Sequence, residues 1–95
     1  MKTKTQIITF LKQHKRQLQE KYKVNKIALF GSFARDEATQ NSDIDIVVDM
    51  PSSFDNFFDL KYFLEDNFNN KVDLIKEKNL RLFIKDKIQK DLIYV

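Results

Sequence analysis

The sequence contains no cysteine, and it has only one glycine and one proline among its 95 residues. The lack of cysteine excludes disulfide bonds, thiolate nucleophiles and zinc–thiolate sites. So little glycine and proline leaves no flexible linker, low-complexity tract or repeat array, and we expect one domain spanning residues 1–95. The single glycine, Gly31, is informative because a chain that otherwise avoids glycine is expected to keep it where the backbone requires it.

Long apolar runs are also missing. No segment approaches the ~18 consecutive apolar residues that a membrane-spanning helix needs. The first six residues are polar and lack the apolar core of a signal peptide. The sequence therefore predicts a cytoplasmic protein without a membrane partner.

Hydrophobic residues make up 42% of the chain and include nine Phe, which favours a packed core over disorder. The net charge is only +3, with 17 basic and 14 acidic residues. This balance permits a nucleic-acid partner without requiring one, and we do not expect one. One group of basic residues could lie on a helix face that is either an RNA contact or an ordinary solvated face, and we favour the second interpretation: Lys12, His14, Lys15, Arg16 and Lys23.

Hydrophobic spacing predicts the order of elements. Apolar residues three, four or seven apart indicate a first helix, and short apolar runs indicate strands. The expected elements are a helix over 4–21, a strand over 27–30, a short helix over 33–37 with Ser32 as N-cap, a strand over 43–49, a helix after Pro51, a strand over 71–75, a helix over 80–90 and a terminal strand or coil over 92–95. This order predicts an α/β (α+β) fold, with a small sheet covered by helices.

Two aspartates begin the second strand. Asp43 and Asp45 are two residues apart, so both side chains point to one face of the sheet, while Ile44 and Ile46 point to the other. Adjacent carboxylates repel unless a cation lies between them, and Mg²⁺, with Mn²⁺ as a substitute, suits such oxygen ligands. Taken alone, the pair is also typical of the polar face of an edge strand.

A third carboxylate, Asp73, lies inside the apolar strand over 71–75, where an uncompensated acid would be costly to bury. It could pair with Lys71. If its strand neighbours that of Asp45, the three carboxylates could instead hold two ions ~3.5–4 Å apart, a spacing that supports phosphoryl displacement.

Gly31 and Ser32 lie where a strand ends just before a helix. Free N–H groups and the helix dipole favour anions at such a place, and glycine lets the backbone approach phosphates closely. Arg35 could face the same site, or it could be a structural partner of Asp43 or Glu37. Alone, Gly31 would more often be a turn glycine, but the combination in this order favours a phosphate site.

The segments Leu29-Phe30-Gly31-Ser32-Phe33-Ala34-Arg35 and Asn41-Ser42-Asp43-Ile44-Asp45 resemble the Gly-Ser and Asp-x-Asp motifs of the polymerase-β nucleotidyltransferase superfamily. Within it, the chain is most similar to the minimal nucleotidyltransferases (MNT domains), including the MntA-like antitoxins of HEPN/MNT toxin–antitoxin systems. The resemblance runs from about Ile27 to Val95. The chain departs from it at Asp36, where relatives often carry glycine.

The resemblance implies a polymerase-β-type nucleotidyltransferase fold with a mixed sheet of three to four strands. It also implies that the catalytic, metal-ligating residues are Asp43, Asp45 and Asp73, with Asp73 helping to activate the attacking hydroxyl, and that two Mg²⁺ ions and ATP are used. The implied nucleotide-binding residues are Gly31, Ser32, Arg35 and Ser42.

The resemblance further implies a partner protein, a HEPN-domain RNase toxin whose tyrosine receives AMP. The alternatives are an antitoxin that acts by binding alone, or transfer to an RNA end or a small-molecule hydroxyl. An aromatic stripe could supply a docking surface, although core packing is the favoured interpretation: Phe54, Phe57, Phe58, Tyr62 and Phe68.

Overall fold

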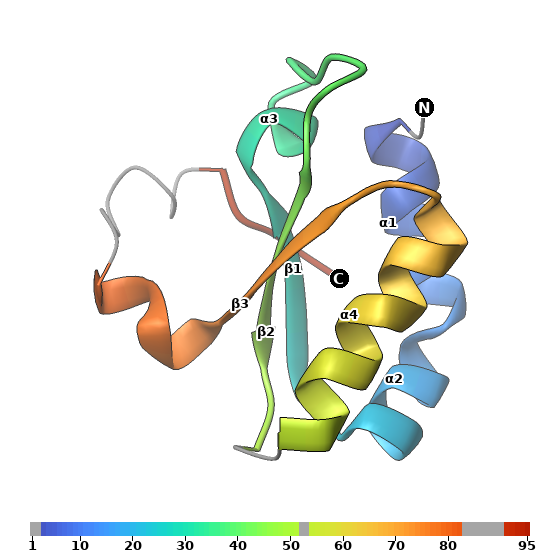
Figure 1. The fold of residues 1–95 in the computed structure, drawn as a ribbon, viewed down its shortest axis with the longest axis vertical. Helices are drawn as coiled ribbons and strands as arrows, with labels where there is room; N and C mark the ends of the chain where they lie inside the picture. The colour runs from blue at the N-terminus through green and yellow to red at the C-terminus, as the bar shows by residue number, and fades with distance from the viewer. Residues whose placement is uncertain (1–2, 52–53, 83–90) are drawn as a thin grey trace.

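The computed structural model describes residues 3–51, 54–82 and 91–95 (Figure 1). Its elements follow the predicted order: α1 (Lys4–Gln13), α2 (Lys15–Tyr22), β1 (Lys26–Phe30), α3 (Gly31–Ala34), β2 (Ile44–Asp49), α4 (Phe54–Phe68), β3 (Val72–Lys76), η1 (Glu77–Leu82) and β4 (Ile93–Tyr94). Among these residues, no helix has the length and apolar character needed to cross a bilayer.

The strands form one mixed sheet in the order β3-β2-β1-β4. β1 is antiparallel to both β2 and β4, whereas β2 and β3 run parallel. Parallel neighbours need a crossover connection, and α4 supplies it. The predicted α/β class, with a small mixed sheet flanked by helices, is confirmed.

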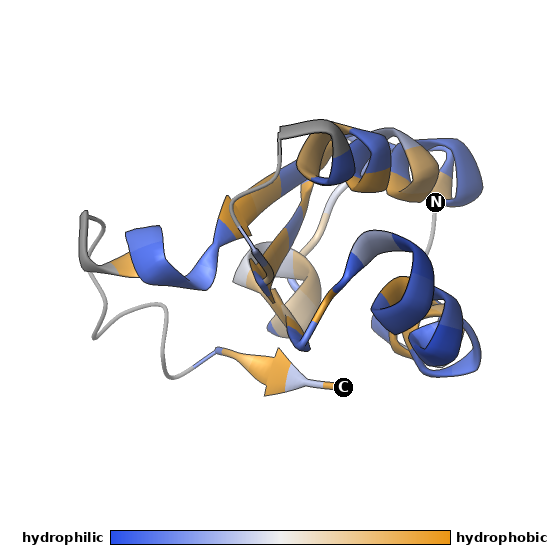
Figure 2. Ribbon diagram, turned by 90° about the horizontal axis from the view of Figure 1, so that it is seen from below, coloured by the Kyte–Doolittle hydropathy of each residue, from blue (hydrophilic) through white to orange (hydrophobic). Residues whose placement is uncertain are grey.

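The helices α1, α2 and α4 cover one face of the sheet, and η1 lies on the other side (Figure 1). Alternate strand residues enter the main core under the helices, among them Leu29, Ile44, Ile46 and Val72, each fully buried. A smaller cluster on the opposite face joins Phe30, Val47 and Leu80. Figure 2 shows hydrophobic and hydrophilic residues alternating around the helices and along the strands, as expected when each element buries one side.

The helix predicted over 4–21 is wrong in one respect, because it is broken in two at His14. This residue has φ −103° and ψ 12°, outside the helical range, and ends α1 where α2 begins. Its ring stacks on Phe10 with centroids 4.0 Å apart, and its Nδ1 lies 2.9 Å from the Phe10 carbonyl oxygen. Hydrophobic spacing could not reveal the break because the apolar period continues through it.

Two further predictions need correction. The short helix after β1 begins at Gly31 with Phe30 as its N-cap, so Ser32 lies inside the helix rather than capping it. The helix predicted over 80–90 is, in its described part, the end of a 3₁₀ helix over Glu77–Leu82, and residues 83–90 lie outside the described residues. The strands predicted over 27–30, 43–49 and 71–75 are observed one residue away at one or both ends, as Lys26–Phe30, Ile44–Asp49 and Val72–Lys76, so Asp43 directly precedes β2. Such differences lie within the usual uncertainty of strand ends.

The aromatic stripe of α4 divides between core and surface. Phe68 is buried and Phe57 packs against the core, whereas Phe58 and Tyr62 are exposed by 47% and 58%. The side chain of Phe54 lies outside the described part. The basic residues of α1 and α2, Lys12, Lys15 and Arg16, are exposed.

Candidate active site

The Gly31 loop and the first residues of β2 meet at one end of the sheet. β1 and β2 are antiparallel, with Phe30 opposite Asp45, so the residue after Phe30 lies beside the Asp45 side chain. Gly31 has φ +74°, a left-handed conformation that favours glycine. A Cβ atom added to Gly31 would lie 3.0 Å from Cγ of Asp45 and would overlap its Oδ2. The sequence therefore uses its one glycine where both the backbone and a neighbouring carboxylate require it.

The parallel pairing of β2 with β3 brings in the third acid. Asp45 and Asp73 are register partners, so their side chains lie side by side on the same face. The amide of Ile44 donates to the carbonyl oxygen of Lys71 at 2.9 Å, which fixes this register at the start of β2. Ile44 and Ile46 are fully buried on the helix-covered face, as predicted, so the acids occupy the opposite face.

The negative charges of Asp43 and Asp73 act on the Asp45 carboxyl group. Partial burial raises the pKa of Asp45 to about 6, with further contributions from the negative charges of Asp73 and then Asp43, while the positive charge of Arg35 acts in the opposite direction. Asp73 is exposed rather than buried, so the burial cost expected from the sequence is avoided. The surroundings therefore disfavour the charged form of Asp45, whose carboxylate lies against Gly31.

This donor set fits a divalent cation. A cation between the carboxylates would relieve the repulsion that, after burial, contributes to the raised pKa of Asp45, and carboxylate oxygens are the ligands that Mg²⁺ prefers. Across residues 3–51, 54–82 and 91–95, no three His, Cys, Asp or Glu side chains are already arranged to hold a metal ion. Cation binding would therefore require the carboxylate side chains to turn toward one another.

Ser32 and Ser42 take different positions. Ser32 directly follows Gly31 in α3, and its carbonyl oxygen accepts a hydrogen bond from the Glu37 amide at 2.8 Å. The Ser42 hydroxyl instead accepts from the Thr39 amide at 2.9 Å and closes the turn before Asp43. In this geometry, Ser42 shapes the loop that leads to the acids.

Arg35 forms ion pairs with two carboxylates, Glu37 and Asp91. Its Nε donates to Oε2 of Glu37 at 3.0 Å, and its Nη1 donates to Oδ2 of Asp91 at 2.8 Å. The hydrogen bond to Asp91, which has the larger effect, and the hydrogen bond to Glu37 raise the pKa of Arg35 above its ordinary value. The sequence had suggested Glu37 as a partner, but not Asp91.

Asp36, the position at which the sequence departs from the resemblance, lies in a left-handed backbone conformation. Asp36 has φ 59°, the left-handed conformation that a glycine adopts easily and that aspartate tolerates better than most residues. Its carboxylate also lies 3.5 Å from Nζ of Lys4. Asp36 therefore adopts a backbone conformation that glycine also adopts easily.

Sequence reasoning missed Asn70. Its side-chain amide donates to the carbonyl oxygens of Ser42 and Lys71, at 3.1 and 3.0 Å. It therefore links the residues that precede β2 to the residue that precedes β3. An asparagine in the turn before a strand was the available signal, but such residues also occur in ordinary turns.

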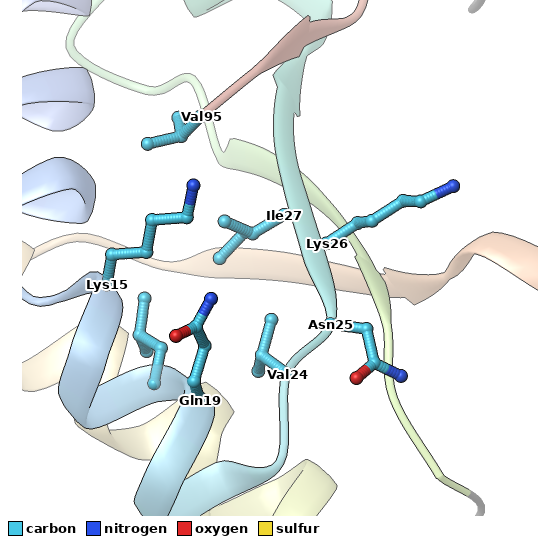
Figure 3. A pocket seen from close by; sticks show the side chains of 8 residues that line it. Lys15, Gln19, Val24, Asn25, Lys26, Ile27 and Val95 are labelled. Carbon is cyan, nitrogen blue, oxygen red and sulfur yellow. The ribbon is translucent and has the colours of Figure 1, made fainter.

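A separate shallow pocket lies between α2 and the beginning of β1 (Figure 3). It is at the end of β1 opposite Gly31, and it contains none of the three acids. Its lining comprises Lys15, Leu18, Gln19, Val24, Asn25, Lys26, Ile27 and Val95. The candidate site is therefore the carboxylate face at the Gly31 end of the sheet.

Residues 11–95 match the family described as the nucleotidyltransferase domain. The chain belongs to the nucleotidyltransferase domain family. A relative in Methanocaldococcus jannaschii, provisionally named a protein adenylyltransferase, is 45% identical over the full length of both chains. The protein adenylyltransferase MntA of Thermococcus cleftensis is 35% identical, covering 100% of this chain and 98% of the relative.

Two solved structures share the fold of this nucleotidyltransferase. One is described as a toxin–antitoxin with AMP-PNP, with 28% identity, a TM-score of 0.54, and coverage of 67% of this chain and 55% of that one. The other, a toxin–antitoxin MntA-HpeT mutant, has 24% identity and a TM-score of 0.55, with coverage of 81% and 59%. This nucleotidyltransferase therefore spans just over half of each of those chains.

Proposed function

We propose that this nucleotidyltransferase transfers AMP from ATP to a tyrosine hydroxyl group of a cognate HEPN-type RNase toxin and thereby acts as its antitoxin. The observation that carries the proposal is the register of Asp45 with Asp73 beside the Gly31 loop. Three acids and a close-approach glycine at one sheet end are the groups that nucleotidyl transfer needs. The names of the two relatives, and the toxin–antitoxin with AMP-PNP among the structural neighbours, support the choice of AMP and of a protein acceptor.

In the proposed reaction, the acceptor oxygen attacks the α-phosphorus of ATP. A new oxygen–phosphorus bond forms, the bond from the α-phosphorus to the bridging oxygen breaks, and pyrophosphate leaves. Asp73 is exposed and adjacent to Asp45, so it can receive the hydroxyl proton at the site. Gly31 and Ser32 would lie along the triphosphate, where the absent Cβ lets the backbone approach it.

Asp43, Asp45 and Asp73 are the residues that would hold two Mg²⁺ ions, with Mn²⁺ as a substitute. When bound, the ions would neutralise the triphosphate and favour ionisation of the attacking hydroxyl. The chain's own part is to supply the carboxylates and to keep them at the phosphate loop. The antitoxin that acts by binding alone is the main competing hypothesis, and it has no need of acids that repel one another.

Intact mass spectrometry of a co-expressed candidate HEPN toxin tests the proposal. We expect the toxin to gain one or more AMP units with the wild-type protein and none with Asp43→Ala/Asp45→Ala. Asp49→Ala is the matched control, because Asp49 lies on the same strand but pairs with Lys26 at the end remote from Gly31. An unmodified toxin that co-purifies with all versions would favour the binding-only antitoxin.

A further inference from the structure

Arg35 joins two distant parts of the chain beside the phosphate loop. It caps α3, the four-residue helix that starts at Gly31. Its hydrogen bond to Asp91, at 2.8 Å, spans 56 positions in the sequence. Glu37 holds the same guanidinium through Nε at 3.0 Å, so two carboxylates fix its orientation.

The sheet explains why Asp91 reaches this place. Leu29 of β1 pairs with Ile93 of the antiparallel strand β4. Asp91 comes two residues before Ile93, and Gly31 two residues after Leu29, so the continued register brings Asp91 level with Gly31. The ion pair therefore links the segment that enters β4 to the loop that leaves β1.

The charges around Arg35 argue against a direct phosphate contact. One guanidinium faces two carboxylates, so the group of Arg35, Glu37 and Asp91 carries a net negative charge, which weakens its attraction for a triphosphate. The Glu37 amide also donates to the Ser32 carbonyl oxygen, which ties the same group to the loop backbone.

We propose that Asp91 is a positioning residue for nucleotidyl transfer, which acts through Arg35 to hold the Gly31–Ser32 loop in place for the nucleotide. The inference rests on the proposed function for the identity of the nucleotide. In this proposal, Arg35 forms a clamp with Asp91 and Glu37 and does not contact the phosphates.

Binding of AMP-PNP with Mg²⁺ separates the two roles of Arg35. If the clamp positions the loop, Asp91→Ala and Arg35→Ala each weaken binding about five- to tenfold, the loss of about one charge-assisted hydrogen bond, and the double variant is no worse than either. If Arg35 contacts the phosphates, Arg35→Ala weakens binding, whereas Asp91→Ala leaves it unchanged or tightens it because the guanidinium is released. This second pattern would overturn the proposal.

Conservative variants distinguish positioning from general destabilisation. Asp91→Glu should recover most of the affinity, and Asp91→Asn, which keeps the shape without the charge, should not. Arg16→Ala is the matched control, because Arg16 forms an exposed ion pair with Glu20 on α2 at 3.1 Å. Arg16→Ala should leave AMP-PNP binding unchanged. An equal loss of AMP-PNP affinity in Arg16→Ala and Asp91→Ala would overturn the proposed clamp.

Amide hydrogen exchange tests the clamp without nucleotide. Exchange over residues 31–36 should be faster in Asp91→Asn than in the wild type, while exchange in α1 stays unchanged. Unchanged exchange over 31–36 would overturn the inference. If the wild type failed to bind AMP-PNP, the proposed function would fall, and this exchange result would still decide the clamp.

Discussion

The Asp45 carboxylate lies against the space that a side chain at Gly31 would occupy. A Cβ atom added there would lie 3.0 Å from Cγ of Asp45, and the φ of +74° is unfavourable for any residue with a side chain. The contact joins Gly31, at the start of α3, to Asp45 of β2. Any side chain at position 31 would overlap the Asp45 carboxylate, so glycine is required there as long as Asp45 keeps its position.

Gly31→Ala should therefore destabilise the protein by about 2–4 kcal/mol, combining left-handed strain with overpacking. In an Asp45→Ala background, the same change should cost only about 1–2 kcal/mol, because the strain remains and the overlap is gone. Denaturant unfolding of the four proteins measures this coupling. Equal costs in both backgrounds would show that the Asp45 side chain does not restrict Gly31.

Asp45→Asn should stabilise the metal-free protein at neutral pH. The folded-state pKa of Asp45 is about 6, above the ordinary value of about 3.9. The folded state thus favours the protonated acid, so the stability associated with Asp45 is fully present below about pH 4 and is lost as the pH rises through about 6. Since Asp45 is only partly buried, solvent screening reduces the effect, and we expect about 1 kcal/mol.

The measurement is the free energy of unfolding of wild type and Asp45→Asn from pH 4 to 7, with a chelator present. The advantage of the variant should grow with pH over this range. Asp49→Asn, on the same strand at its other end, is the control and should show no comparable growth. A variant advantage that shrinks as the pH rises would contradict the raised pKa.

Divalent cations should stabilise the wild type more than the carboxylate variants. A ligand that binds only the folded state adds about 2.7 kcal/mol at a concentration about 100 times its Kd. Thermal unfolding with Mg²⁺ or Mn²⁺ should show this increase for wild type and Asp49→Ala, and little of it for Asp43→Ala/Asp45→Ala. The same increase in all three proteins would place the cation elsewhere.

Lys23→Gly should stabilise the fold away from the site. Lys23 ends α2 with φ 60°, and its amide donates to the Leu18 carbonyl oxygen, so glycine can take its place without the left-handed strain. We expect a gain of about 1 kcal/mol in denaturant unfolding. The control is Lys21→Gly, an exposed position inside the same helix, which should lose about 1 kcal/mol. A loss in both variants would argue against the left-handed end of α2.

Much of the site could be predicted because its determinants are local. Strand alternation assigns Asp43 and Asp45 to one face and buries Ile44 and Ile46 on the other. The scarcity of glycine singles out Gly31. Element order was also predictable, whereas the break at His14 was not, because the apolar period continues through it from α1 into α2.

The sequence by itself determined the fold class, the elements that carry the acids and the loop that carries the glycine, because each follows from a local period or a single residue's backbone freedom. Only the tertiary structure decided that Asp73 lies level with Asp45 and that Asp91 reaches Arg35. Both relationships depend on which strands are neighbours and in which register. Strand order comes from packing the whole sheet against its helices, and no local pattern records it.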